Sequence, residues 1–196
     1  MTLRALPQVY SFEGIVPVID PSAFVHPSAV LIGDVIVGPG CYVGAGAVLR
    51  GDFGRIVMER ESNLQDNCIV HSGPRLDCTM RERAHIGHGV VLHYCTVERD
   101  ALVGISAVVM DRAIVGEQAI VAAMSFVRIG QEIAPRTMVA GVPARMLREV
   151  SAADLAFKKQ GTDLYVELAR RCLGGMSAVQ PLTRPEQDRG RTNWSF

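Results

Sequence analysis

Aliphatic residues recur at every sixth position along much of the chain. A period of six fits neither the 3.6 residues of a helical turn nor the alternation of one long strand, but it is typical of short strands that are separated by corners. Two such series cover the N-terminal quarter and the middle of the chain. They consist of Val25, Leu31, Val37, Val43 and Leu49, and of Val97, Val103, Val109, Val115, Val121 and Val127.

Small residues mark a second position in each six-residue unit. If each unit forms one flat face and three faces close a coil, the aliphatic residue points inward and the small residue fits the corner. The alternative, a β-sandwich with chance spacing, would not produce two such series. We therefore expect an all-β solenoid, a parallel β-helix over residues 1–150. In the first series, Phe53 occupies this small-residue position and breaks the pattern. In the second series the small residues are Ala101, Ala107, Ala113, Ala119 and Ser125.

The repeat lapses between about residues 55 and 84, where the chain becomes polar. We interpret residues 72–83 as a loop that protrudes from the coil. Its arginines, Arg75, Arg81 and Arg83, are either available to bind phosphates or simply part of a solvated loop. After residue 127 the repeat ends, and prolines and glycines exclude a continuous helix before about residue 150.

Residues 151–179 form the next predicted segment, which is helical. Ser151 and Asp154 resemble an N-cap with an acidic first turn, whereas Gly161 predicts a break and a second cap at Thr162. One apolar side of this helix would lie against the solenoid or a neighbouring subunit. That side consists of Leu164, Leu168, Ala169 and Cys172. Residues 180–196 follow as a polar tail, in which Trp194 and Phe196 could act as anchors.

Composition and charge exclude several functions. Lys and Arg together number 20, as do Asp and Glu, so the net charge is zero and there is no basic field for nucleic acid or anionic lipid. No stretch approaches the ~20 apolar residues that cross a bilayer, and the N-terminus has no apolar run typical of a signal peptide. The five cysteines form no C-x-x-C pair, which argues against disulfides and a cysteine zinc site. We expect a cytoplasmic protein that binds neither nucleic acid nor membranes.

Three of the five histidines occupy related positions of the repeat. His71 and His93 each follow an inward aliphatic residue, Val70 and Leu92, so both take the same outward place and could stack on one face. His88 belongs to the preceding unit and should leave the coil from a different face. Around a threefold axis, however, His88 could complete a site that a neighbouring subunit begins. This arrangement predicts a homotrimer with metal sites at its interfaces.

Three imidazoles with an open fourth position are the usual ligand set of a catalytic zinc ion, whose bound water has a pKa near ~7. Imidazole also suits Fe²⁺ and Co²⁺. Taken singly, each of the three histidines is more easily explained as a surface residue, but their joint placement favours a metal site. His26 and His85 share no such phase, and we expect solvent or a corner carbonyl to satisfy them.

The segments around these histidines resemble the γ-class carbonic anhydrase family. The motifs are LRGDFGRI at residues 49–56, SNLQDNCIVHS at 62–72 and AHIGHGVVLHYCTV at 84–97. The resemblance implies a left-handed coil. It also implies His71, His88 and His93 as the metal ligands.

The same resemblance assigns roles to four residues around the ligands. It implies an ion pair between subunits from Arg50 to Asp66, with Asp52 and Gln65 lining the site. The chemistry is compatible, since a charge pair fixes the register of an interface and an amide can orient a water molecule. A purely structural role in the trimer would explain Arg50, Asp52 and Asp66 equally well.

Nearly the whole chain resembles a group of hexapeptide-repeat proteins from phenylacetate-degradation operons, the PaaY group, and its relatives from carnitine operons, the CaiE group. Besides the motifs above, the resemblance covers FVHPSAVLIGDVIVG at residues 24–38 and LAFKKQGTDLY at 155–165. It implies a thioesterase that removes dead-end coenzyme A thioesters.

Two departures from the γ-class pattern change the expected chemistry. Phe53 follows Asp52 where the best-studied anhydrases have glutamate, and the 72–83 loop is basic rather than acidic. The proton-shuttling glutamates that rapid CO2 hydration needs are therefore missing. Tyr94 replaces a residue that is usually small, and it could narrow the site or donate a hydrogen bond.

The leading hypothesis is a metal-dependent thioesterase in which Gln65, Asp52 and Tyr94 have catalytic roles. Carbonic anhydrase activity, with CO2 or bicarbonate as the small-molecule substrate, is the close alternative. Two further alternatives stay open. A coenzyme A-dependent acyltransferase usually relies on one catalytic histidine and would not need three, and a non-catalytic assembly protein would tolerate the loss of all three histidines.

Overall fold

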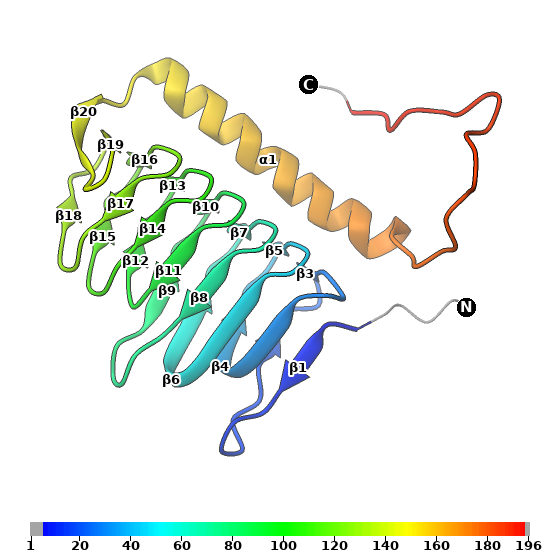
Figure 1. The fold of residues 1–196 in the computed structure, drawn as a ribbon, viewed down its shortest axis with the longest axis horizontal. Coiled ribbons are helices and arrows are strands. Elements are labelled where there is room, and N and C mark those ends of the chain that lie inside the picture. Colours follow the sequence, from blue (N-terminus) through cyan, green and yellow to red (C-terminus); the bar gives the residue numbers. More distant parts are fainter. Residues whose placement is uncertain (1–5, 195–196) are drawn as a thin grey trace.

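The computed structural model describes residues 6–194 and confirms the predicted solenoid. The chain winds as a left-handed parallel β-helix, and one helix, α1 (Ala152–Gly175), runs back along the coils from the C-terminal end toward the N-terminal end (Figure 1). No helix in the described part of the chain is long and apolar enough to cross a bilayer.

The strands stack into three faces, which we call A, B and C. Face A contains β1 (Gln8–Tyr10), the first halves of β4 (Val30–Val37) and β6 (Val48–Met58), β8 (Ile69–His71), β11 (Val91–His93), β14 (Val108–Val109) and β17 (Phe126–Val127). Face B contains β2 (Val18–Ile19), the second halves of β4 and β6, β9 (Cys78–Met80), β12 (Thr96–Val97), β15 (Ile114–Val115) and β18 (Glu132–Ile133). Face C contains β3 (Phe24–Val25), β5 (Tyr42–Val43), β7 (Asn63–Leu64), β10 (His85–Ile86), β13 (Leu102–Val103), β16 (Ile120–Val121), β19 (Thr137–Ala140) and the antiparallel β20 (Arg145–Glu149).

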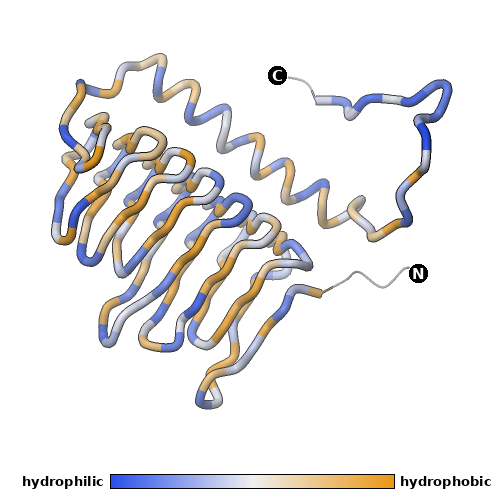
Figure 2. Tube along the Cα trace, viewed as in Figure 1, coloured by the Kyte–Doolittle hydropathy of each residue, from blue (hydrophilic) through white to orange (hydrophobic). Residues whose placement is uncertain are grey.

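The six-residue pattern corresponds to the core. Every aliphatic residue of the two predicted series is buried, with at most 3% of its surface exposed. The predicted corner alanines are fully buried as well, because a larger side chain would not fit where the backbone turns. Figure 2 shows the hydrophobic residues repeating from coil to coil, and the hydrophilic character of the segment after α1.

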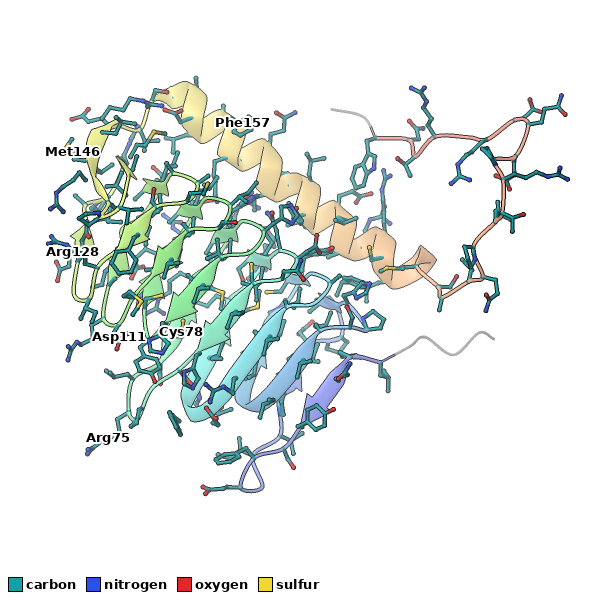
Figure 3. The ribbon with its side chains drawn as sticks, in the orientation of Figure 1. Arg75, Cys78, Asp111, Arg128, Met146 and Phe157 are labelled. Carbon is teal, nitrogen blue, oxygen red and sulfur yellow. The ribbon has the colours of Figure 1, made fainter. Side chains whose placement is uncertain are left out.

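The predicted loop at residues 72–83 is wrong in its extent. Cys78–Met80 forms β9, which pairs with β6 on one side and β12 on the other. Cys78 and Met80 are fully buried on either side of Thr79, and this alternation escaped notice because the flanking residues are polar. The loop is therefore only the turn between β8 and β9, and Figure 3 shows Arg75 pointing away from the coil at its tip.

The predicted break at Gly161 and Thr162 is also wrong, because α1 is continuous. The predicted cap at Ser151 is confirmed: its hydroxyl accepts a hydrogen bond from the backbone N–H of Asp154, whose carboxylate accepts one from the backbone N–H of Ser151. Thr162 faces the solenoid and is fully buried. A single helical glycine costs about 1 kcal/mol relative to alanine, which is less than the packing of a long helix provides.

The helix packs on face C mainly through polar contacts. Lys158 has 3% of its surface exposed, and its Nζ donates to the carbonyl of Arg83 at 2.6 Å and to Asp100 Oδ1 at 2.8 Å. The predicted apolar side is only partly correct. Ala169 is buried against the coil, whereas Leu164 and Leu168 line a hollow with Trp194 of the tail.

We predict that Gly161→Ala stabilises the protein by up to about 1 kcal/mol, since the site has helical backbone. The added methyl group would meet only His85 Cε1, at an ordinary contact distance of 3.5 Å. Thermal unfolding of the purified variant measures the effect.

Gly104→Ala provides the matched comparison. A methyl group there would come within 2.5 Å of the backbone nitrogen of Ala123, so this variant should unfold at a lower temperature than the wild type. A Gly161→Ala protein that is equally destabilised would contradict the helix packing described above.

Candidate metal centre

Strands β8 and β11 place two histidines side by side on face A. His71 and His93 are register partners in adjacent coils, as the sequence pattern predicted. The nitrogen atoms that face each other, His71 Nδ1 and His93 Nε2, are 3.4 Å apart. His71 is buried, and the side chain of His93 is about one third exposed.

The other nitrogen of each ring contacts a carboxylate. His71 Nε2 lies 3.0 Å from Asp52 Oδ1, and His93 Nδ1 lies 2.5 Å from Asp111 Oδ1. When each ring donates its N–H to the carboxylate and carries no second proton, the lone pairs of the two facing nitrogens are directed at one another. Two lone pairs at this distance repel unless a proton or a metal ion lies between them.

The facing nitrogens fit two ligands of one tetrahedral metal ion. With metal–nitrogen bonds of ~2.0 to 2.1 Å, two such ligands are about 3.4 Å apart. A carboxylate behind each histidine is also the usual arrangement around metal-bound imidazoles, because it fixes the tautomer and the ring orientation.

Local electrostatics favour the protonation states that metal binding needs. Burial lowers the pKa of His71, in spite of the opposing hydrogen bond to Asp52. Burial alone would raise the pKa of Asp52, but hydrogen bonds from Arg50 and His71 outweigh it, so the pKa is lowered. Neutral imidazole beside an ionised carboxylate results.

His88 lies at a different corner, beyond the end of β10 on face C. Its Nδ1 is 3.1 Å from Asp66 Oδ2, and its Nε2 is 3.5 Å from the hydroxyl of Tyr165 on α1. Within residues 6–194 no group of three or more His, Cys, Asp or Glu side chains is arranged to hold a metal ion. A single chain therefore brings His71 and His93 together but not His88.

Gln65 is buried at the corner that carries Asp66 and His88. Its Nε2 lies 3.1 Å from Asn63 Oδ1 and 2.8 Å from His85 Nε2. The expectation that solvent or a backbone carbonyl satisfies His85 is thus wrong, because side chains from β7 and α1 surround it. Burial lowers the pKa of His85 to about 4, so its ring is neutral.

Arg50 and Tyr94 are the remaining predicted site residues near His71 and His93 on face A. Arg50 Nη1 lies 2.5 Å from Asp52 Oδ2 in the same chain, and Asp66 pairs with His88, so the intersubunit pair of Arg50 with Asp66 has no counterpart within one chain. Tyr94 stacks on the ring of His93, with centroids 3.8 Å apart and an angle of 22° between the planes. It covers one face of that ring.

The comparisons with known proteins match this architecture. Residues 17–51 match the model of the bacterial transferase hexapeptide family, which describes six repeats. The carnitine operon protein CaiE of Salmonella agona is 54% identical over 182 residues, covering 93% of this chain and 92% of the relative. CaiE of a Proteus species is 49% identical over 183 residues, covering 93% of each chain. The chain belongs to the CaiE family of hexapeptide-repeat proteins.

Solved structures resemble this CaiE-family chain over most of its length. A hexapeptide transferase family protein from Anaplasma phagocytophilum is 34% identical, with a TM-score of 0.80, and the match covers 83% of this chain and 96% of that one. A protein from Bacillus cereus described as a putative acetyltransferase is 32% identical, with a TM-score of 0.84, covering 85% and 97%.

Sequence reasoning missed Asp111, Tyr165 and the true surroundings of His85. Asp111 follows His93 by 18 residues, the length of one coil of the repeat. That spacing could have identified Asp111 as a neighbour of His93. Tyr165 gave no such signal, because its contact with His88 depends on how α1 packs.

The loop arginines do not form a shared phosphate site. Arg81 pairs with Glu59 at 2.7 Å, and Arg83 pairs with Glu61 and Asp163, all away from the turn that carries Arg75. This part of the sequence interpretation is wrong, because Arg81 and Arg83 are engaged in ion pairs and β9 separates them from Arg75.

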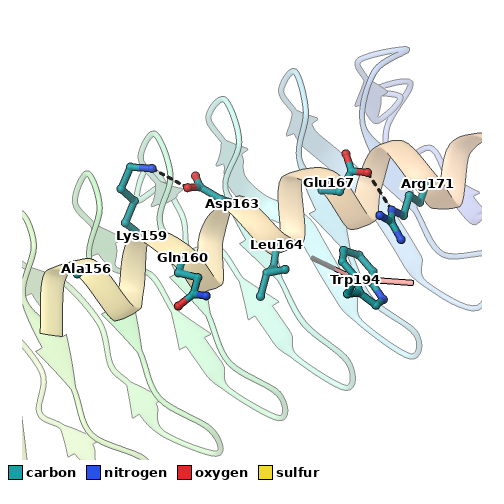
Figure 4. Close-up of a pocket in the computed structure, with 8 residues that line it drawn as sticks. All are labelled: Ala156, Lys159, Gln160, Asp163, Leu164, Glu167, Arg171 and Trp194. Carbon is teal, nitrogen blue, oxygen red and sulfur yellow. Dashed lines mark hydrogen bonds and ion pairs between the residues drawn. The ribbon is translucent and has the colours of Figure 1, made fainter. Parts of the chain in front are cut away.

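A groove of about 460 Å³ lies on the outer side of α1, where Trp194 packs over Arg171 (Figure 4). Its walls are helix and tail residues, and none of the predicted site residues lines it. Hollow shape alone therefore does not locate the chemistry in this CaiE-family protein.

We predict that His71→Ala and His93→Ala each abolish binding of Zn²⁺, and that Asp111→Asn weakens it roughly 10- to 100-fold, because the amide no longer holds the His93 tautomer. Competition titration with a chromogenic chelator measures the affinity.

Asp34→Asn is the matched control. Asp34 pairs with Arg55, away from both histidines, so its loss should leave metal affinity unchanged. Equal affinities for Asp111→Asn and the wild type would contradict the assigned role of Asp111.

Proposed function

We propose that the protein is a metal-dependent hydrolase that cleaves acyl-coenzyme A thioesters. The observation that carries this proposal is the pair of facing nitrogens on His71 and His93, each backed by a carboxylate. Zn²⁺ is the metal that this donor set suits, with Fe²⁺ or Co²⁺ as alternatives.

The proposal includes a homotrimer in which His88 of a neighbouring subunit is the third ligand. The outward side of face A supports an interface next to His71 and His93, because it is a column of apolar residues, one of which, Ile69, is 49% exposed. The column consists of Val30, Val48, Ile69, Val91, Val108 and Phe126.

A bound metal ion would act as a Lewis acid and lower the pKa of a water molecule to about 7. The chain's own residues would position the other participants. Arg50 and His71 keep Asp52 ionised, and Asp52 in turn orients His71. Phe53, which is 55% exposed and has its ring 5.4 Å from that of His71, forms an apolar edge against which an acyl group can lie.

Proton transfer favours a thioester over CO2 as the substrate. Rapid CO2 hydration needs a residue that carries a proton away at every turnover, and Phe53 stands where the best-studied γ-class anhydrases have a glutamate for this purpose. Thioester hydrolysis also releases one proton per turnover at neutral pH: the departing thiolate, with a pKa near ~8.5, takes up a proton, but the carboxylic acid product ionises. A hydrolase with slow turnover can pass this proton directly to solvent, whereas rapid CO2 hydration needs a dedicated shuttle.

The relatives support two classes of acyl group. The similarity to carnitine operon proteins supports an acyl group from carnitine metabolism. The motif resemblance to the PaaY group supports an aromatic acyl group from phenylacetate degradation. A cytoplasmic location suits either substrate, and the cysteines of the described residues, none of which forms a disulfide, agree with it.

An acyltransferase is the second candidate, because two solved structures at 32% and 34% identity are described as a transferase family protein and an acetyltransferase. A transferase would pass the acyl group to an amine or hydroxyl and would not need the second histidine of the facing pair. Product analysis separates the two reactions.

We predict that mixing His88→Ala subunits with His93→Ala subunits restores about one quarter of the metal sites, since each interface needs one subunit of each kind in the correct order. Metal content after verified subunit exchange provides the measurement. Mixing His71→Ala with His93→Ala is the control and should restore none, because both changes lie on the same side of the interface. Equal recovery of metal binding in both mixtures would contradict a site shared between subunits.

We also predict faster hydrolysis of thioesters than hydration of CO2, with both activities lost on chelation. Steady-state kinetics of zinc- and iron-loaded protein on CO2 and on aromatic and aliphatic coenzyme A thioesters test this. If CO2 hydration is fast while every thioester is inert, the protein is an anhydrase and the assignment falls.

A further inference from the structure

A small network of buried polar side chains lies between face C and α1, next to the His88 corner. Asn63, Gln65 and Thr162 are each at most 3% exposed, and all three contact His85. Polar groups are buried in this way only when they satisfy one another. Gln65 has a catalytic role in the sequence-based hypothesis, whereas the other members of the network have had no role so far.

The amide nitrogen of Gln65 points inward, into this network. Gln65 Nε2 donates one hydrogen to Asn63 Oδ1 and the other to His85 Nε2, the shorter contact at 2.8 Å. His85 Nε2 is then the acceptor. The other ring nitrogen, Nδ1, lies 3.2 Å from Asn63 Nδ2 and 3.3 Å from Thr162 Oγ1.

This orientation leaves the carbonyl oxygen of Gln65 as its only free polar atom. Among residues 6–194 every buried side-chain nitrogen and oxygen has a hydrogen-bond partner. Because Gln65 Oε1 takes part in no hydrogen bond of the structure, it must be the atom that reaches the surface. The next residue in the chain, Asp66, contacts His88.

The same histidine also packs against the second group that faces His88. The ring of Tyr165 meets that of His85 edge to face, with centroids 5.4 Å apart and an angle of 83°. The Tyr165 hydroxyl then lies 3.5 Å from His88 Nε2, the nitrogen opposite the one that Asp66 contacts. One side chain thus touches both Gln65 and Tyr165.

We propose that His85 is a positioning residue: it holds the Gln65 amide with its carbonyl oxygen outward and sets the Tyr165 ring, so that both present polar oxygens beside His88. The Gln65 oxygen can accept a hydrogen bond from a water molecule at the shared site and orient it toward a substrate carbonyl. This inference rests on the proposed function in its catalytic part, whereas its structural part stands alone.

The test compares His85→Ala and Thr162→Val with the wild type in two measurements. The first is hydrogen exchange of the Gln65 side-chain amide, followed by NMR in protein labelled with ¹⁵N-glutamine and assigned with Gln65→Glu. We expect exchange to be roughly tenfold faster or more in His85→Ala, because the amide loses its acceptor. The second is steady-state hydrolysis of the best coenzyme A thioester by zinc-loaded protein. We expect kcat to fall roughly tenfold or more while KM changes little.

His26→Ala is the matched control, because His26 contacts Ser28 at an exposed position away from this network. It should leave both measurements unchanged. His85→Gln, which can still present an acceptor, should recover part of the kcat. If His85→Ala does not fold, Thr162→Val carries the test, with the same directions and smaller effects.

Unchanged amide exchange in the variants, or a wild-type kcat in His85→Ala, would overturn the positioning role. A wild type that hydrolyses no thioester would instead remove the proposed function. In that case the amide exchange still decides whether His85 orients Gln65.

Discussion

The parallel register of face A is the constraint on which the rest of the structure depends. Side chains of a strand alternate between its two sides. Leu49, Val70 and Leu92 form one buried column. The residues that follow them, Arg50, His71 and His93, therefore form a column on the outer side of the coil. A shift by one residue would bury the histidines and expose the aliphatic column. The core therefore aligns the two histidines, and the carboxylates behind them only adjust the rings.

The rigid shape of the coil separates the candidate site into two halves, one with His71 and His93 and the other with His88. A coil with three flat faces cannot bend to bring the His88 corner toward His71 and His93, so the proposed chemistry requires a second chain. The half that carries His88 depends on α1, which contributes Tyr165 and Thr162 and is itself fixed by the buried contact of Lys158 with Asp100. Helix packing and site geometry are linked in this way, whereas the outer groove at Trp194 contributes no site residue.

Much of the fold could be predicted because a six-residue period has one simple explanation, and the shared phase of His71 and His93 follows from it directly. The errors arose where local signals compete with packing. Gly161 predicts a break in the helix, but α1 is continuous, and the next residue, Thr162, is buried against His85. Cys78–Met80 reads as loop because its one outward residue and its flanks are polar. The network around His85 could not be predicted, since it joins segments about 75 residues apart whose contact exists only after folding.

The most direct test of the shared metal site is anomalous diffraction at the zinc edge, from crystals of protein purified without chelators and supplied with Zn²⁺. The account predicts a peak between His71 Nδ1 and His93 Nε2, with His88 of a neighbouring subunit completing the ligands. A structure in which that position has no anomalous signal, and in which His88 points to solvent far from any other histidine, would contradict it.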